Sequence, residues 1–182
     1  PNYYVILNYI HTIVLHHMKS SHPTGLHYFH RNPHPKKERH GDCGVRAICL
    51  ALDLPYNKVW RAATKAKREI SPYYYDQYGR KKKSKVTATW SLSRRELERT
   101  LLLLDVWNWN YYRIASSQED RAIFKAENFP HHCIAHQNRH WVAVKDDAIW
   151  DSWDSRGKRN KELRGYFATQ SLQEELFPKL YA

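Results

Sequence analysis

Among the chemically reactive side chains of this sequence, Cys43 has the setting of a nucleophile. It lies in the segment GDCGVRAI, at the start of an apolar run that predicts a buried helix over 43–54, with Asp42 as its N-cap. Unpaired N–H groups and the macrodipole at a helix N-terminus lower the pKa of a thiol, so this position favours the thiolate. Gly41 and Gly44 are expected to leave the backbone around the sulfur open to a substrate.

A thiolate nucleophile needs a general base, and His140 has the position for one. It begins the run HWVAV, which predicts a strand, and a histidine at a strand end is held rigidly by its neighbours in the sheet. A carboxylate must then orient the imidazole. The next predicted strand leads into DSWDS, so Asp151 and Asp154 both compete for that role.

The turn between these two strands decides which carboxylate faces His140. With a turn of two or four residues around the Asp-Asp pair, Trp153 opposes His140 and Asp151 lies one diagonal step away, about 7 Å by backbone. A three-residue turn would bring Asp154 to that face instead. The turn has no glycine, which favours a four-residue loop over the tight two-residue form. Asp151 is therefore the preferred third residue, and Asp154 is the alternative.

The order of these residues, a cysteine at a helix start, a histidine at a strand start and an aspartate on the following strand, is similar to that of the papain-like cysteine peptidase superfamily. The segments GDCGVRAI and NRHWVAV resemble its small bacteriophage and viral members, and the cysteine segment also resembles OTU-type deubiquitinases. The resemblance implies an α+β, papain-like fold in which N-terminal helices pack on a C-terminal antiparallel sheet. It also implies a cysteine hydrolase that cleaves a peptide or isopeptide bond through a thioester, without a cofactor.

The sequence departs from the papain-like pattern at the oxyanion site. Members of that superfamily usually supply a donor from a Gln several residues before the cysteine, and no Gln precedes Cys43. The N–H of Cys43 would remain as one donor, and Asn32 or His40 is the candidate for the second. The OTU pattern has Asp where this chain has His40, which argues against deubiquitination in particular.

The chain is predicted to divide into an irregular arm over 1–41 and a catalytic domain over 42–182. The arm is rich in histidine and proline without periodicity, and its first 17 residues can be an extension upstream of Met18. The expected elements of the domain, beyond the first helix, are helices over 56–70 and 117–128, a helix capped by Ser93 and Glu96, strands over 106–114, 133–137, 140–145, 149–153 and 165–168, and a short C-terminal helix.

The strong positive charge predicts an anionic partner. The formal net charge is +12, and the basic segment Arg80, Lys81, Lys82, Lys83 and Lys85 follows a cluster of tyrosines. This segment is a candidate binding site for an acidic protein or peptide substrate, or for nucleic acid. Two alternatives to the enzyme therefore stay open, a catalytically inactive papain-like scaffold and a basic nucleic-acid-binding protein.

A metal site is a weaker hypothesis. His131, His132, Cys133, His136 and His140 cluster within ten residues, and zinc sites use such ligands. Residues in a strand alternate between faces, however, so these side chains would have to span a turn to converge. No metal is therefore predicted.

The cysteine count indicates a reducing compartment. Three cysteines without framework spacing argue against a disulfide-stapled secreted fold, and Cys49 and Cys133 are expected to be inert core residues. The apolar start of the chain is interrupted by Asn8 and His11 and is too short to span a bilayer. A cytoplasmic protein is expected, in the host cytoplasm if the chain is viral.

Overall fold

The structure is a computed structural model. It describes residues 20, 22–37, 41–75, 78, 80–83, 91–114, 122–123, 130–138, 140–146, 148–156 and 162–171. The segment 1–17, His40, Lys85 and residues 172–182, where the short C-terminal helix was expected, lie outside the described residues.

The helices come first in the chain and form one layer. They are α2 (Cys43–Leu52), α3 (Tyr56–Ile70) and α4 (Arg94–Leu103). α2 is apolar on nearly all sides because it lies between the sheet and the other two helices, whereas α3 buries only one stripe. α4 begins with the capping box predicted from the sequence, in which the Ser93 hydroxyl accepts from the N–H of Glu96 and the Glu96 carboxylate accepts from the N–H of Ser93.

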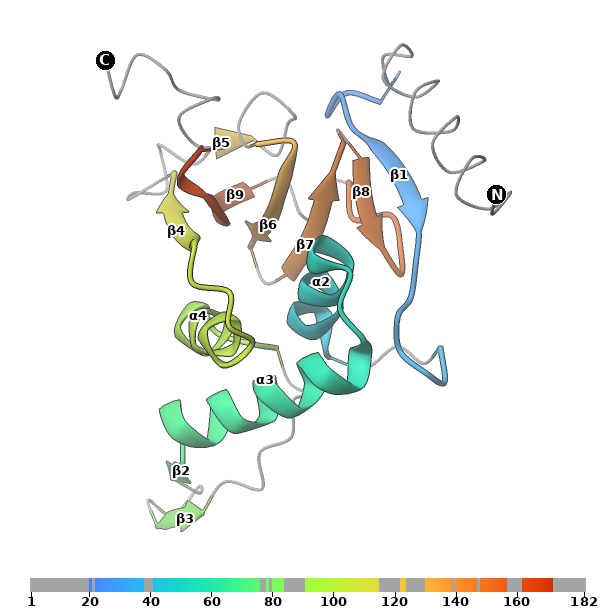
Figure 1. Cartoon of the computed structure of the whole chain (residues 1–182). Coiled ribbons are helices and arrows are strands. Elements are labelled where there is room, and N and C mark those ends of the chain that lie inside the picture. Colours follow the sequence, from blue (N-terminus) through green and yellow to red (C-terminus); the bar gives the residue numbers. More distant parts are fainter. Residues whose placement is uncertain are drawn as a thin grey trace.

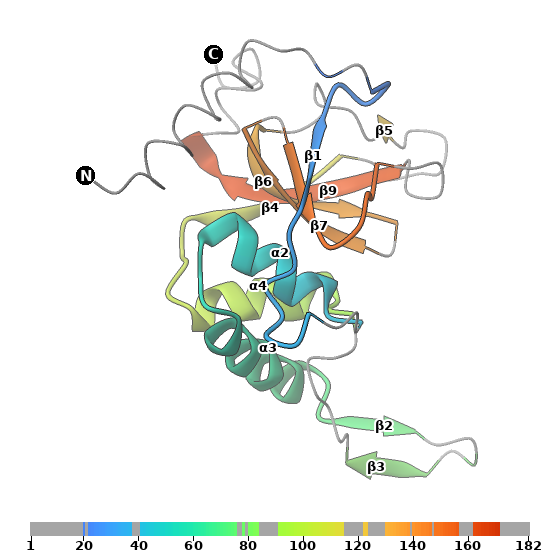
Figure 2. The same ribbon diagram turned by 90° about the vertical axis from the view of Figure 1, so that its right-hand side faces the viewer.

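The second layer is a mixed sheet that the helices cover on one face (Figure 1). Six strands lie in the order β1-β8-β7-β6-β9-β4, and β5 pairs with β9 beside β4. A separate two-stranded ribbon, β2–β3, extends from the end of α3 away from the sheet (Figure 2). The strands are β1 (His27–His30), β2 (Tyr73–Tyr75), β3 (Lys81–Lys83), β4 (Trp109–Arg113), β5 (Ala122–Ile123), β6 (His132–Gln137), β7 (His140–Lys145), β8 (Ala148–Asp151) and β9 (Glu162–Thr169).

The sequence-based expectations were wrong at two places in the sheet. The arm is not wholly irregular, because its residues His27–His30 form β1 and pair in parallel with β8, which makes the sheet mixed rather than antiparallel. The helix expected over 117–128 is contradicted at Ala122–Ile123, which pair with β9, and its other residues lie outside the described part. Both strands are short and pair with segments far along the chain, so local composition gave no signal for them.

The sheet buries a core on each of its two faces. Along β7, Trp141 and Ala143 pack toward the helices, whereas Val142 and Val144 pack on the opposite face. The helix-facing core centres on the contact of α2 with β7, which brings the start of α2 to the end of the sheet where β7 begins and β8 ends. Among the described helices, none is long and apolar enough to cross a membrane.

Candidate functional site

Three side chains from distant parts of the chain meet where α2 faces the central strands. Cys43 is the first residue of α2, His140 is the first residue of β7, and Asp151 is the last residue of β8. Each therefore stands at the end of a regular element whose remaining residues are fixed by core packing. Such placement holds the three groups rigidly.

The β7–β8 hairpin places Asp151 beside His140. Ala143 pairs with Trp150, Val144 with Ile149 and Lys145 with Ala148, which is the register predicted from an even-numbered turn. The preference for a four-residue loop was wrong, because pairing continues to Lys145 and leaves a two-residue turn. Asp146 adopts a left-handed conformation with φ of 50° in that turn, a conformation that the short side chain of aspartate tolerates.

The imidazole of His140 is held on both sides. Its Nε2–H donates to Oδ2 of Asp151 at 2.6 Å, which leaves Nδ1 as the ring nitrogen for its hydrogen bond with the Cys43 thiol. The second oxygen of Asp151, Oδ1, accepts the backbone N–H of Ser152 at 2.7 Å. Both carboxylate oxygens are therefore engaged, and the ring can turn only by breaking a buried hydrogen bond.

The electrostatics of the site favour the thiolate and imidazolium forms. Burial by itself raises the pKa of Cys43, but hydrogen bonds from His140, the backbone of Trp141 and Ser91 outweigh it, so the thiol pKa is lowered. Burial likewise lowers the pKa of His140, but the hydrogen bonds to Asp151 and Cys43 raise it to about 9. Both shifts therefore favour the thiolate and imidazolium pair over the neutral thiol and imidazole.

Trp153 covers the imidazole. The centroids of the Trp153 and His140 rings are 5.0 Å apart, and Trp153 keeps 36% of its surface exposed. Cys43 and His140 are each 8% exposed, so the pair is largely shielded from water but still reaches the surface. Shielding strengthens the attraction between the two charges because the effective dielectric constant is lower.

Ser91 is a site residue that the sequence analysis missed. Its hydroxyl hydrogen-bonds to the sulfur of Cys43. The segment that carries it is fixed beside the site, because the carbonyl of Ser91 accepts from the Lys67 ammonium at 3.3 Å and the carbonyl of Leu92 accepts from the indole N–H of Trp141 at 2.7 Å. No local motif indicated a role for Ser91, because the capping box that follows it indicates only the start of α4.

Gly44 does not open the backbone to a substrate, contrary to the sequence-based expectation. A Cβ atom at this position would lie 2.9 Å from Cδ1 of Leu92. The absent side chain instead allows the Ser91–Leu92 segment to pack closely on the first turn of α2. Gly44 thus serves the site by bringing Ser91 to the sulfur.

Asp42 precedes the nucleophile but its side chain does not cap α2, contrary to expectation. The buried carboxylate accepts hydrogen bonds from Arg46, one turn along the helix, and from the hydroxyl of Tyr56 at 2.6 Å. An unpaired carboxylate here would oppose ionisation of the adjacent thiol. Pairing with the Arg46 guanidinium removes that penalty and ties the start of α2 to α3.

The other predicted site residues take different positions. Asp154 is exposed and forms a two-pronged ion pair with Arg156, at 2.9 and 2.8 Å, whereas Asp151 holds His140. Asn32 is buried on the segment after β1, where its Oδ1 accepts the N–H of His34 at 3.0 Å. Its part as an oxyanion donor, like that of His40, stays a prediction.

The histidine cluster of β6 is spread over different partners. The Nε2 atom of His132 lies 2.8 Å from the carbonyl of Ala51, and His136 stacks on Trp141 with ring centroids 3.9 Å apart. Burial lowers the pKa of His136 to about 4. Within the described ranges, no three His, Cys, Asp or Glu side chains are grouped to hold a metal ion.

The two remaining thiols differ from Cys43. Burial and the neighbouring Asp42 carboxylate raise the pKa of Cys49 to about 12, and burial alone raises the pKa of Cys133 well above its usual value. All three cysteines are free, but only Cys43 has an environment that stabilises a thiolate.

Part of the predicted basic segment lies on the projecting ribbon. Lys81, Lys82 and Lys83 form β3, each paired with a tyrosine of β2. The guanidinium of Arg80 lies 4.9 Å from the ring centroid of Tyr78. Figure 2 shows the ribbon far from the strand ends that carry His140 and Asp151.

Comparisons with known proteins give no assignment of function, so the geometry of the site is the basis for one. No protein-family model, no curated protein and no solved structure matches this chain.

Proposed function

We propose that the chain is a papain-like cysteine hydrolase that cleaves a peptide or isopeptide bond through a thioester intermediate. The observation that carries the proposal is the position of the His140 imidazole, which is hydrogen-bonded to Asp151 on one side and to Cys43 on the other. A cysteine with a lowered pKa beside an oriented imidazole is the arrangement that nucleophilic thiol catalysis requires.

The first half of the reaction forms the acyl-enzyme. The Cys43 thiolate attacks the carbonyl carbon of the scissile bond, a C–S bond forms, and the carbonyl π electrons move to oxygen. As the first residue of α2, Cys43 has a backbone N–H that no helical carbonyl accepts, and this group donates to the developing oxyanion. The C–N bond then breaks, and the His140 imidazolium gives its proton to the leaving amine.

The second half of the reaction releases the acid. His140, now neutral, takes a proton from water, and the resulting hydroxide equivalent attacks the thioester carbonyl. The C–S bond breaks, the carboxylic acid leaves, and the sulfur regains its negative charge beside the reprotonated ring. Asp151 keeps Nε2 protonated throughout, so that Nδ1 is the atom that exchanges protons with sulfur, amine and water.

An electrophilic probe that reacts with thiols tests this proposal. A peptide vinyl sulfone or a ubiquitin-type electrophilic probe is expected to label Cys43, and intact mass followed by peptide mapping locates the adduct. The Cys43→Ala variant should lose the label, whereas the matched Cys49→Ala variant should keep it. Labelling at Cys49 or Cys133 in the folded protein would favour the inactive scaffold. The same conclusion would follow if no probe labelled the protein and the Cys43 thiol were as unreactive as Cys49.

A second candidate function belongs to the ribbon. β2–β3 projects from the helical layer, with Tyr73 52% exposed, Tyr78 71% exposed and Arg80 exposed beside it (Figure 2). Exposed aromatic rings beside lysine and arginine bind single-stranded nucleic acid by stacking and phosphate contact. We propose this as a binding function separate from the hydrolase.

Fluorescence anisotropy with a labelled single-stranded oligonucleotide tests the ribbon. Affinity is expected to fall steeply with salt, to weaken in a Lys81→Gln, Lys82→Gln, Lys83→Gln variant, and to survive Cys43→Ala. Affinity that is unchanged by the triple substitution would remove this candidate.

The three free thiols fit a reducing compartment such as the cytoplasm, which we propose as the place of action.

A further inference from the structure

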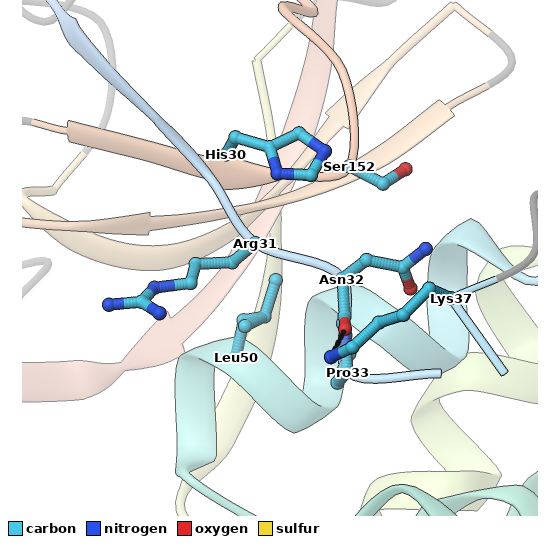
Figure 3. Close-up of a pocket in the computed structure, with 7 residues that line it drawn as sticks. All are labelled: His30, Arg31, Asn32, Pro33, Lys37, Leu50 and Ser152. Carbon is cyan, nitrogen blue, oxygen red and sulfur yellow. Dashed lines mark hydrogen bonds between the residues drawn. The ribbon is translucent and has the colours of Figure 1, made fainter. Parts of the chain in front are cut away.

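A pocket of about 550 Å³ lies between the segment that follows β1 and the last turn of α2. Figure 3 shows the chain from His30 to Pro33 crossing above Leu50 of α2, with Ser152 on the neighbouring strand end. Seven residues line this pocket, and none of them is acidic: His30, Arg31, Asn32, Pro33, Lys37, Leu50 and Ser152.

The pocket adjoins Asp151, the residue that orients His140. His30 pairs with Asp151 in the β1–β8 ladder, and the N–H of Arg31 donates to the carbonyl of Asp151 at 2.7 Å. Ser152 follows Asp151 and donates its N–H to the carboxylate that orients His140. Leu50 stands seven residues after Cys43 on α2, about 10 Å along the helix axis. This distance corresponds to about three residues of extended peptide, which sets the length of substrate that would contact both places.

The lining has the chemistry of an anion site. The Lys37 ammonium donates to the carbonyl of Asn32 at 2.8 Å, which holds its charge at the pocket wall. In Figure 3 the side chains of Asn32 and Lys37 lie beside each other below Ser152. Ser152 is 1% exposed, and within the described part of the chain its hydroxyl has no hydrogen-bond partner. A buried hydroxyl is normally paired, so an unpaired one at a pocket indicates a ligand or water.

We propose that this pocket binds a carboxylate of the substrate, either an acidic side chain near the scissile bond or a free C-terminus. The inference rests on the proposed hydrolase function and names its substrate class as peptides that carry a carboxylate near the scissile bond. Lys37 supplies positive charge, and the polar groups of Asn32 and Ser152 supply direction. Arg31 adds a second positive charge on the other side of Leu50, where its guanidinium lies 5.7 Å from the ring centroid of Trp150 (Figure 3). Because Arg31 and Lys37 are exposed, salt screens the attraction.

The experiment compares matched pairs of electrophilic probes on the full chain. One pair is a tripeptide vinyl sulfone with Glu or Gln two residues from the reactive group, and the other is an epoxysuccinyl dipeptide with a free or an amidated C-terminus. The first pair tests an acidic side chain, and the second tests a C-terminal carboxylate. The second-order rate of Cys43 labelling is measured by intact mass, and in one pair the acidic member is expected to react about twofold to fivefold faster at low salt.

Variants that change the charge of the pocket identify the residues responsible for the preference for the acidic probe. Arg31→Gln and Lys37→Gln should each reduce the ratio, and Arg31→Glu combined with Lys37→Glu should reverse it. Arg61→Gln on the exposed face of α3 should leave the ratio unchanged. Iodoacetamide labelling of Cys43 at an unchanged rate in every variant shows that the fold and the nucleophile are intact. The reversal in the variant with both Arg31→Glu and Lys37→Glu is an outcome that loss of folding cannot produce.

Failure of this inference and failure of the proposed function give different results. Equal rates within both pairs, with rapid labelling of Cys43, would overturn the carboxylate pocket and leave the hydrolase standing. A preference unaffected by the Arg31 and Lys37 substitutions would also overturn it. The proposed function would be overturned if Cys43 reacted with none of the probes and reacted with iodoacetamide no faster than Cys49. The role of the pocket in substrate binding would then fail as well.

Discussion

Replacing Asp151 with asparagine tests the link between the carboxylate and the thiolate. The pKa of His140 rises from 6.5 to about 9 although burial opposes the rise, and the hydrogen bond to Asp151 is the largest contribution that raises it. This corresponds to about 3 kcal/mol in favour of the imidazolium, at ~1.4 kcal/mol for each pKa unit. Asparagine removes the negative charge while keeping the shape, so roughly half or more of that energy is lost.

The sign of the effect follows from the pairing of the two charges. Below the pKa of His140 the ring is protonated and stabilises the thiolate, which is why the pKa of Cys43 is low. Without Asp151 the imidazolium is less stable, so the shared proton returns to the sulfur. In Asp151→Asn the pKa of Cys43 is therefore expected to rise, and the thiolate population below that pKa to fall. Turnover should fall further, by about 10²- to 10⁴-fold, because the ring also loses its orientation.

The assay is the rate of Cys43 alkylation by iodoacetamide between about pH 4 and pH 10, read by peptide mass spectrometry. The inflection in the wild-type protein should lie below the ordinary thiol pKa of 9.0, and in Asp151→Asn it should move up toward that value. The control is Asp154→Asn, which removes a nearby exposed carboxylate that pairs with Arg156. If the two variants behave alike, or if the wild-type inflection already lies near 9.0, the electrostatic reasoning is refuted.

Three further predictions concern the surroundings of the thiol. Ser91→Ala should raise the inflection of the same labelling curve, because one hydrogen bond to the sulfur of Cys43 is lost; an unchanged curve would remove Ser91 from the site. Gly44→Ala should lower the free energy of unfolding by about 1–3 kcal/mol in urea denaturation, since the added methyl group would meet Leu92 at 2.9 Å, and wild-type stability would contradict that contact. Cys49, with a pKa raised to about 12, should stay unlabelled at pH 8 until urea unfolds the protein, and labelling without urea would show that its burial is wrong.

The fold class could be predicted because its signals are local. The apolar run after Cys43 and the box formed by Ser93 and Glu96 predicted helices that the structure contains. The alternation in HWVAV predicted β7, and strand parity predicted the register that brings Asp151 to His140. Each of these depends on residues a few positions apart, where side-chain spacing and backbone geometry are directly related.

Other features could not be predicted because their partners are distant. β1 is recognised as a strand only through β8, whose pairing residues lie more than a hundred positions later in the chain. The two-residue turn depends on Asp146 accepting a left-handed conformation that the flanking strands impose. The packing of Leu92 on Gly44 reversed the expected role of that glycine, since the space beside a glycine is defined by what folds against it.

The sequence by itself determined the candidate groups, Cys43, His140 and the two competing aspartates, together with the elements that carry them, because residue type and periodicity are properties of the chain. The tertiary structure decided which aspartate holds the imidazole, that Ser91 reaches the sulfur, and that a basic pocket adjoins Asp151. These facts depend on distances between segments far apart in the chain, and such distances exist only once burial of the common core has brought α2 against β7.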